Sequence, residues 1–340
     1  MNYRPLVLFA AGLASAPALA QSNVTIYGIA DVGIGYAKAG DTTFTGIIDG
    51  VLSGPRFGFK GSEDLGNGLQ AVFVLEQGYS VGSGAPASTS RQFHRQAWAG
   101  LRGGFGTIAL GRQYAPGYKY PGRFSAGVPG TVFNSQALLV NSIPGASIHP
   151  GTDARWNNSI AYILGKAGGF MAEAIYSFQD DQSGDDRDED DRAGIGVGYA
   201  SGPIGVGAVY HYSKRAADDL KEVYVGGSYD FGGAELFASY QTAEAGDVVD
   251  AAVAYLGVAI PLGNGKLHTD VGQLSDDRND DNDTTSVTIG YTHGLSKRTT
   301  LYAMVNRMDN DDAAGRGAAF ADTEDGESTT SVGLGLRHKF

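Results

Sequence analysis

The stretch 331–340 of the chain reads SVGLGLRHKF. Val332, Leu334 and Leu336 alternate in it with small, polar or cationic residues. A repeat of two places successive side chains on opposite faces of a β-strand, whereas a helix would repeat about every 3.6 residues. The stretch is therefore predicted to be a strand with one apolar face and one small, polar or cationic face.

The same alternation recurs along most of the chain. It is clear in 56–62, RFGFKGS, and in 155–164, RWNNSIAYIL. Within the second segment, parity predicts that Trp156 faces outward together with Ile160. Almost the whole chain after its first twenty residues is therefore expected to be strand.

Two kinds of connection separate these strands. Glycine supplies the positive φ angles that tight hairpin turns need. The seven short, glycine-rich connections are 65–68, 103–106, 165–169, 201–203, 231–233, 262–265 and 294–297. The segments between them are interpreted as longer polar loops. Seven short turns alternating with eight longer loops predict sixteen strands.

Sorting of connections by length is typical of a transmembrane β-barrel, which has an even strand number and strands of about ten residues. Lipid cannot satisfy the peptide groups of an open sheet edge, so such a sheet must close. Phe340, at the end of its strand, fits the aromatic girdle of a barrel. The predicted fold is an all-β, sixteen-stranded antiparallel transmembrane barrel.

The first twenty residues have the three parts of a secretory signal peptide. Arg4 precedes the apolar run 6–13, and the small residues of 18–20 form a cleavage site. We therefore expect a signal peptide over 1–20 and a barrel over 21–340, with Gln21 as the first mature residue.

Composition excludes several classes of function. The chain has 340 residues, 52 glycines and no cysteine, so disulfides, zinc–thiolate sites, Fe–S clusters and a cysteine nucleophile are absent. A net charge of −12 disfavours nucleic acid as a partner. The six histidines are scattered and no nucleophile-elbow motif occurs. No enzyme activity, cofactor or metal site is expected.

Much of the acidity lies in three segments, 180–191, 276–283 and 309–327. They hold 20 of the 37 acidic residues and three arginines, so the rest of the mature chain is net positive. We interpret them as a solvated acidic rim. The alternative is loose binding of divalent cations that bridge to lipopolysaccharide phosphates. Asn282 replaces the glycine that a calcium loop needs at its sixth position, so an EF-hand is excluded.

Five stretches resemble the general porins of Gram-negative outer membranes, in particular the trimeric porins of β-proteobacteria. They are 24–28 (VTIYG), 56–66 (RFGFKGSEDLG), 95–101 (RQAWAGL), 105–114 (FGTIALGRQY) and 335–340 (GLRHKF). The resemblance implies a multi-pass outer-membrane homotrimer surrounded by lipid and lipopolysaccharide. It also implies a passive channel for small hydrophilic solutes, and a third external loop folded into the lumen as a constriction.

The third loop, 114–153, is about forty residues long and contains many apolar residues. Its charged residues are Lys119, Arg123 and, at its end, Asp153. No acidic residue lies between 114 and 152, whereas in many general porins this loop carries carboxylates that face wall arginines. We therefore expect a constriction dominated by positive charge.

The wall supplies the remaining cations of the predicted constriction. Parity places Arg56 and Lys60 inward on the second strand; Arg95 lies on the fourth, with Trp98 at the opposite parity, and Arg155 opens the sixth. By resemblance, Arg56, Arg95 and Arg155 match the family's arginine cluster. The predicted pore constriction is Arg56, Lys60, Arg95, Arg155, Lys119 and Arg123, and its possible wall counter-charges are Asp31, Glu76 and Asp153.

A narrow passage lined by cations favours anions, and by resemblance these include phosphate or dicarboxylates. The alternative for each arginine is pairing with a wall carboxylate. One alternative function is a sugar-preferring porin, in which Tyr118, Tyr120 and Phe124 would stack on sugar rings. The other is a surface binding protein that is anchored by its barrel and binds a partner through its acidic loops.

Overall fold

A computed structural model describes residues 23–149, 154–178, 191–279 and 281–340. No helix within these ranges is both long enough and apolar enough to span a membrane. The predicted signal peptide, 1–20, lies outside the described residues, as does Asp153.

Seventeen β-segments and three short helices make up the described fold. The strands are β1 (Asn23–Ala39), β2 (Thr42–Asp49), β3 (Arg56–Gly66), β4 (Leu69–Gly78), β5 (Gln96–Gly103), β6 (Gly106–Tyr114), β7 (Arg155–Ala167), β8 (Phe170–Ser177), β9 (Arg192–Ser201), β10 (Ile204–Ser213), β11 (Leu220–Asp230), β12 (Glu235–Ala245), β13 (Val249–Leu262), β14 (Gly265–Asp276), β15 (Thr284–Gly294), β16 (Thr299–Asn310) and β17 (Thr329–Lys339). The helices are α1 (Pro116–Lys119), α2 (Pro121–Phe124) and α3 (Ser135–Val140).

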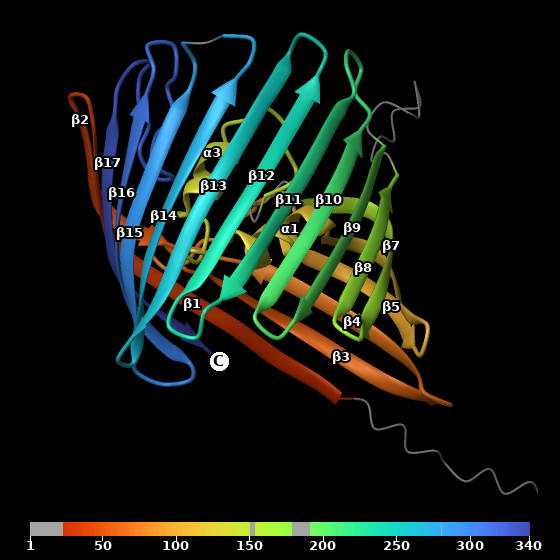
Figure 1. The fold of residues 1–340 in the computed structure, drawn as a ribbon. Coiled ribbons are helices and arrows are strands. Elements are labelled where there is room, and N and C mark those ends of the chain that lie inside the picture. The colour runs from red at the N-terminus through yellow and green to blue at the C-terminus, as the bar shows by residue number, and fades with distance from the viewer. Residues whose placement is uncertain (1–22, 150–153, 179–190, 280) are drawn as a thin grey trace, which may run out of the picture.

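These segments form one closed antiparallel barrel of sixteen strands (Figure 1). β2 and β3 count as one strand because they pair with the same edge of β1, over Thr42–Asp49 and Arg56–Ser62, with 50–55 between them. β17 pairs with the other edge of β1 over Ile29–Ala39 and closes the ring. The predicted fold class and strand number are confirmed.

Strand residues alternate between two faces. On β11, for example, Val223 and Val225 are exposed, while Glu222 and Tyr224 are fully buried. A barrel that spans lipid turns its apolar residues outward and its polar residues inward. The exposed face is therefore the outer one, and the face with buried polar groups is the inner one.

The predicted alternation of short turns and long loops is wrong at two places. All seven glycine-rich turns connect consecutive strands at one end of the barrel, which we call the short-turn end. At the other end, however, β1 and β2 are joined by only two residues, and β12 and β13 by only three. Gly40 and Gly246 have φ of 50° and 47° there, and a glycine with positive φ closes a tight hairpin at either end.

The predicted outward position of Trp156 is also wrong. The β6–β7 register shifts between Gly111 and Gln113, and Asn158 has a φ of 41°. This bulge reverses the parity of the strand, so Trp156 is only 1% exposed, although Ile160 faces outward. The Trp156 ring lies 4.6 Å from the ring of His211 on the inner face of β10.

The third long-loop connection, residues 115–154, contains all three helices and packs against distant strands. α1 and α2 contact strands from β8 to β12, and α3 contacts β13 to β15. The helices lie within the ring of strands in Figure 1. Buried carboxylates of the wall hold the connection in place. Glu222 accepts hydrogen bonds from the Ser147 and Ile148 amides. Asp270 accepts one of 2.7 Å from the Ser135 hydroxyl. Apolar clusters fill the space between the connection and the wall.

The segment 50–55, which interrupts the second strand, forms a ledge beneath this connection. The carboxylate of Asp31 accepts hydrogen bonds from the amides of Leu52 and Ser53 and from the Tyr302 hydroxyl. Gly130 of the connection lies directly against the ledge, because a Cβ there would come within 2.0 Å of the Val51 carbonyl oxygen. Gly130 also has a φ of 93°.

Replacing Gly130 with alanine is therefore expected to separate the connection from the ledge. The positive φ alone costs about 1–2 kcal/mol, and the backbone clash adds to it. The matched control is Gly202→Ala in the β9–β10 turn, which also has a positive φ, 55°, but has no atom within 4 Å of the added Cβ. Urea unfolding in phospholipid vesicles should give a clearly larger loss for Gly130→Ala; equal losses would contradict the close packing of the connection on the ledge.

Candidate functional site

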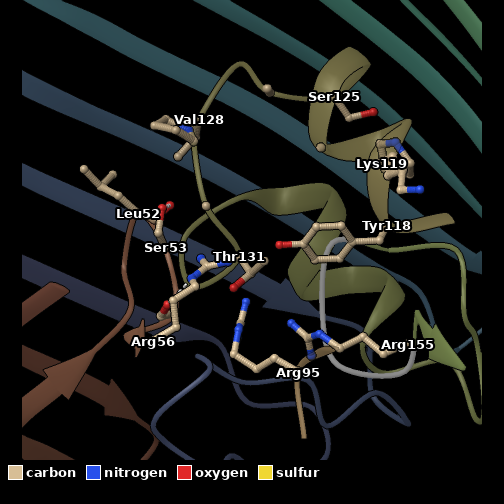
Figure 2. A pocket seen from close by; sticks show the side chains of 16 residues that line it. Leu52, Ser53, Arg56, Arg95, Tyr118, Lys119, Ser125, Val128, Thr131 and Arg155 are labelled. Carbon is tan, nitrogen blue, oxygen red and sulfur yellow. Dashed lines mark hydrogen bonds between the residues drawn. The ribbon is translucent and has the colours of Figure 1, made fainter. Parts of the chain in front are cut away.

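A cavity of about 630 Å³ lies between the third connection and the wall. Figure 2 shows Arg56, Arg95 and Arg155 gathered on one side of it, with Tyr118 and Lys119 of α1 opposite. The arginines come from β3, the residue before β5 and the start of β7. Four of the six residues predicted for the constriction thus line one cavity.

Glu76 on β4 is the carboxylate at the base of this cluster and is 3% exposed. The Arg95 Nε donates to its Oε1 at 2.9 Å, and an Arg56 guanidinium nitrogen lies 3.9 Å from the same atom. The Tyr27 hydroxyl donates to Oε2 at 2.9 Å. Two arginines therefore share one buried carboxylate. Its hydrogen bond holds Arg95, and the Gly54 carbonyl oxygen accepts a hydrogen bond of 3.0 Å from the Arg56 Nε.

Arg155 has a different environment. Its guanidinium carbon lies 4.9 Å from the centre of the Tyr114 ring and 5.6 Å from that of Tyr118. The two rings stack at 3.7 Å, and the faces of aromatic rings attract cations. Among the described residues, no carboxylate lies within ion-pair distance of Arg155, and its buried Nε has no hydrogen-bond partner.

The positive charge of the cluster lowers the pKa of two groups outside the strands, Tyr118 in the third connection and His94 between β4 and β5. Burial raises the pKa of Tyr118, but Arg56, Arg95 and Arg155 outweigh it and lower the pKa below its usual value. Burial, followed by the charges of Arg95 and Arg155, lowers the pKa of His94 to about 4. His94 is therefore neutral at pH 7.

Lys119 lines the cavity but is paired. Its Nζ lies 2.6 Å from Oε1 of Glu173, a carboxylate on β8 that is 4% exposed. The sequence interpretation missed Glu173. The sequence pattern that could have identified Glu173 is a single acidic residue in the otherwise uncharged strand 170–177. Glu173 has the same inward parity as Ile175 and Ser177.

Two predicted cavity residues lie elsewhere. Lys60 is on the inner face of β3, but four residues from Arg56, which places it about 14 Å closer to the short-turn end; it lines a separate hollow. Arg123 is exposed, because α2 turns Phe124 toward the wall and Arg123 away from it, 5.5 Å from the Phe124 ring.

The predicted counter-charges also separate. Glu76 lies in the arginine cluster. Asp31 instead accepts hydrogen bonds from the amides of the ledge and is not paired with a cavity arginine. Of the aromatic residues considered for sugar stacking, only Tyr118 lines the cavity. Tyr120 and Phe124 are buried against the inner face of β9 and β10, close to Gly196 and Gly207.

Two of the three acidic segments are described only in part. The segment 180–191 lies almost entirely outside the described residues. Within the described ranges, no group of three or more His, Asp or Glu side chains is placed to hold a metal ion. In the second segment Arg278 forms an ion pair with Asp276 of the same segment, and in the third the Arg316 Nε donates to the Ser142 hydroxyl of the third connection.

Comparisons with known proteins identify the family of the chain. A family model described as Gram-negative porin matches residues 7–313. An outer membrane porin protein of Bordetella pertussis is 32% identical, with 97% of each chain covered, and outer membrane porin protein 32 of Delftia acidovorans is 33% identical, with 99% of each covered.

Solved structures show the same similarity. The anion-selective porin from Comamonas acidovorans superposes with a TM-score of 0.82 at 28% identity, covering 94% of this chain and all of that one. A trimer form of OmpT from Vibrio cholerae shares the fold, with a TM-score of 0.67 at 18% identity over 94% of this chain and 99% of that one. A closed sixteen-stranded barrel and similarity along nearly the whole sequence lead to one conclusion: the chain belongs to the Gram-negative porin family and crosses the outer membrane with multiple β-strands.

Proposed function

We propose that this porin is a passive channel for small hydrophilic solutes and that its arginine-lined cavity is a constriction that prefers anions. One observation carries the proposal: Arg56, Arg95 and Arg155 line one cavity, and among the described residues their only ion-pair partner is Glu76, which pairs with the first two. The name of the Comamonas relative, an anion-selective porin, supports it.

The proposed mechanism is partitioning by charge. Arginine stays protonated at any physiological pH, so the cluster is permanently cationic. A passage with low-dielectric walls and one sign of charge attracts the opposite ion and repels its own. Arg155, which lines the cavity and has no carboxylate partner among the described residues, replaces part of the hydration shell of an anion, and the aqueous cavity keeps binding weak enough for release.

Lys119 contributes little net charge in this mechanism, because its ion pair with Glu173 offsets it. The acidic segments 276–283 and 309–327, at the end of the barrel opposite to the short-turn end, act in the opposite sense. Screening is weak at low ionic strength, so they reduce the anion preference most in dilute salt.

Substitution of the arginines tests the proposal most directly. Removing one unit charge about 7 Å from a passing ion in water changes its free energy by about 0.6 kcal/mol, or roughly threefold in partitioning. Changing Arg56, Arg95 and Arg155 together to glutamine should therefore lower the anion-to-cation permeability ratio at least about tenfold. The ratio is measured from reversal potentials in a KCl gradient across a planar bilayer.

Glu76→Gln is the matched control, because it changes a charge of opposite sign within the same cluster. It should raise the same ratio roughly threefold. A cation-selective wild-type protein, or an arginine triple variant that keeps the wild-type ratio, would rule out the arginine constriction. Conductance that is lost altogether would instead favour the barrel as an anchor.

The pKa of His94 predicts a pH dependence with a definite sign. Because that pKa is about 4, His94 gains its positive charge only in strong acid and then adds to the anion preference. Wild type and His94→Asn should give the same reversal potential at pH 7 and pH 5.5, and wild type should become the more anion-selective near pH 4. A difference that already develops between pH 7 and 5.5 would mean that His94 titrates normally.

We further propose that the mature chain begins at Gln21 and assembles as a homotrimer. Native mass spectrometry of the purified protein should give a complex of three chains, each with the mass of residues 21–340. Retention of residues 1–20, or a monomer in mild detergent, would contradict the respective part of the proposal.

A further inference from the structure

A second hollow, of about 380 Å³, lies on the inner face closer to the short-turn end. Thr25, Lys60, Val74 and Trp98 form one row of cross-strand neighbours across β1, β3, β4 and β5. Glu76 lies on the adjacent row, two residues along β4, which is a spacing of about 7 Å. The hollow thus lies next to the arginine cluster, on the side of the short-turn end.

The hollow is cationic. Its basic residues are Lys60 and Arg102, and none of the residues that line it is acidic. Neither cation has an ion-pair partner within 4 Å among the described residues. Of the nearby wall carboxylates, Glu76 on the adjacent row is paired with Arg95, and Asp64 accepts a hydrogen bond from the Gly66 amide in the β3–β4 turn. The hollow therefore offers two cations to a negatively charged ligand.

Trp98 gives the same hollow a flat apolar surface. The structure places it at the inward parity, in register with Val74, and its side chain is partly exposed. Its Nε1 donates to Gln96 Oε1 at 3.2 Å, which fixes the indole ring. Lys60 is held with its Nζ 5.2 Å from the centre of the Tyr27 ring. A fixed indole beside two cations matches a ligand that carries both a planar ring and a carboxylate.

We propose that this hollow binds small aromatic carboxylates, with the ring against Trp98 and the carboxylate between Lys60 and Arg102. Its volume lies in the range of small-molecule sites. The site is separate from the arginine cluster and does not depend on that cluster being anion-selective. It makes the inner wall selective for solute shape as well as for charge.

Intrinsic fluorescence provides a direct test, because the chain has only two tryptophans and Trp156 is buried. The probe is 4-nitrobenzoate, a quencher of indole emission, added to the full-length protein in detergent. Saturable quenching is expected, and the uncharged 4-nitrobenzyl alcohol should bind about tenfold more weakly. Trp98→Phe should remove the saturable quenching and leave the Trp156 emission.

Charge variants assign the carboxylate. The double variant Lys60→Gln, Arg102→Gln should weaken 4-nitrobenzoate binding about tenfold. Lys297→Gln is the matched control, since it removes one exposed cation from the β15–β16 turn at the same end of the barrel and should change nothing. If the double variant fails to fold, each single variant should weaken binding about threefold, whereas Lys60→Arg should retain it.

Three results would each overturn the assignment: equal affinity for the alcohol, unchanged affinity after loss of both cations, or undiminished quenching in Trp98→Phe. Failure of the proposed constriction would look different. Cation-selective reversal potentials together with saturable quenching at Trp98 would reject the arginine constriction and leave this site standing.

Discussion

Lipid offers no hydrogen-bond partner to a peptide group, so every strand that crosses the membrane must be paired on both edges. This chain meets the requirement by pairing β1 with β17, and Phe340, just after β17, exchanges two backbone hydrogen bonds with Gly28 of β1. Ring closure then decides which side chains face each other across the interior. The outer face is left to lipid, and polar chemistry is confined to the inner face.

Buried polar groups of the inner wall bind the third connection. Glu222 and Asp270 are buried polar groups of the wall, and both accept hydrogen bonds from the connection. Buried carboxylates are costly unless they are hydrogen-bonded, so these contacts bind the connection to a defined part of the wall. The cavity exists because the connection is held against the far strands, β8 to β15, and leaves space beside the arginines.

Net charge is a poor guide to what such a barrel passes. The chain as a whole is at −12, which alone suggests repulsion of anions. The structure gathers three arginines at the cavity, only two of which pair with Glu76, and places two more cations beside Trp98 in the second hollow. A passing solute experiences the charges within a few ångströms of its path much more strongly than screened charges at a distant rim.

The sequence by itself determined the strand pattern, the strand number, the family and most of the cationic side chains, because side-chain parity and glycine turns are local properties. Only the tertiary structure decided which cations meet. The bulge at Asn158 reversed the parity predicted for Trp156, and the pairing of Lys119 with Glu173 joins residues 54 positions apart. Register and bulges are set by pairing between distant segments, and a period of two carries no information about that pairing.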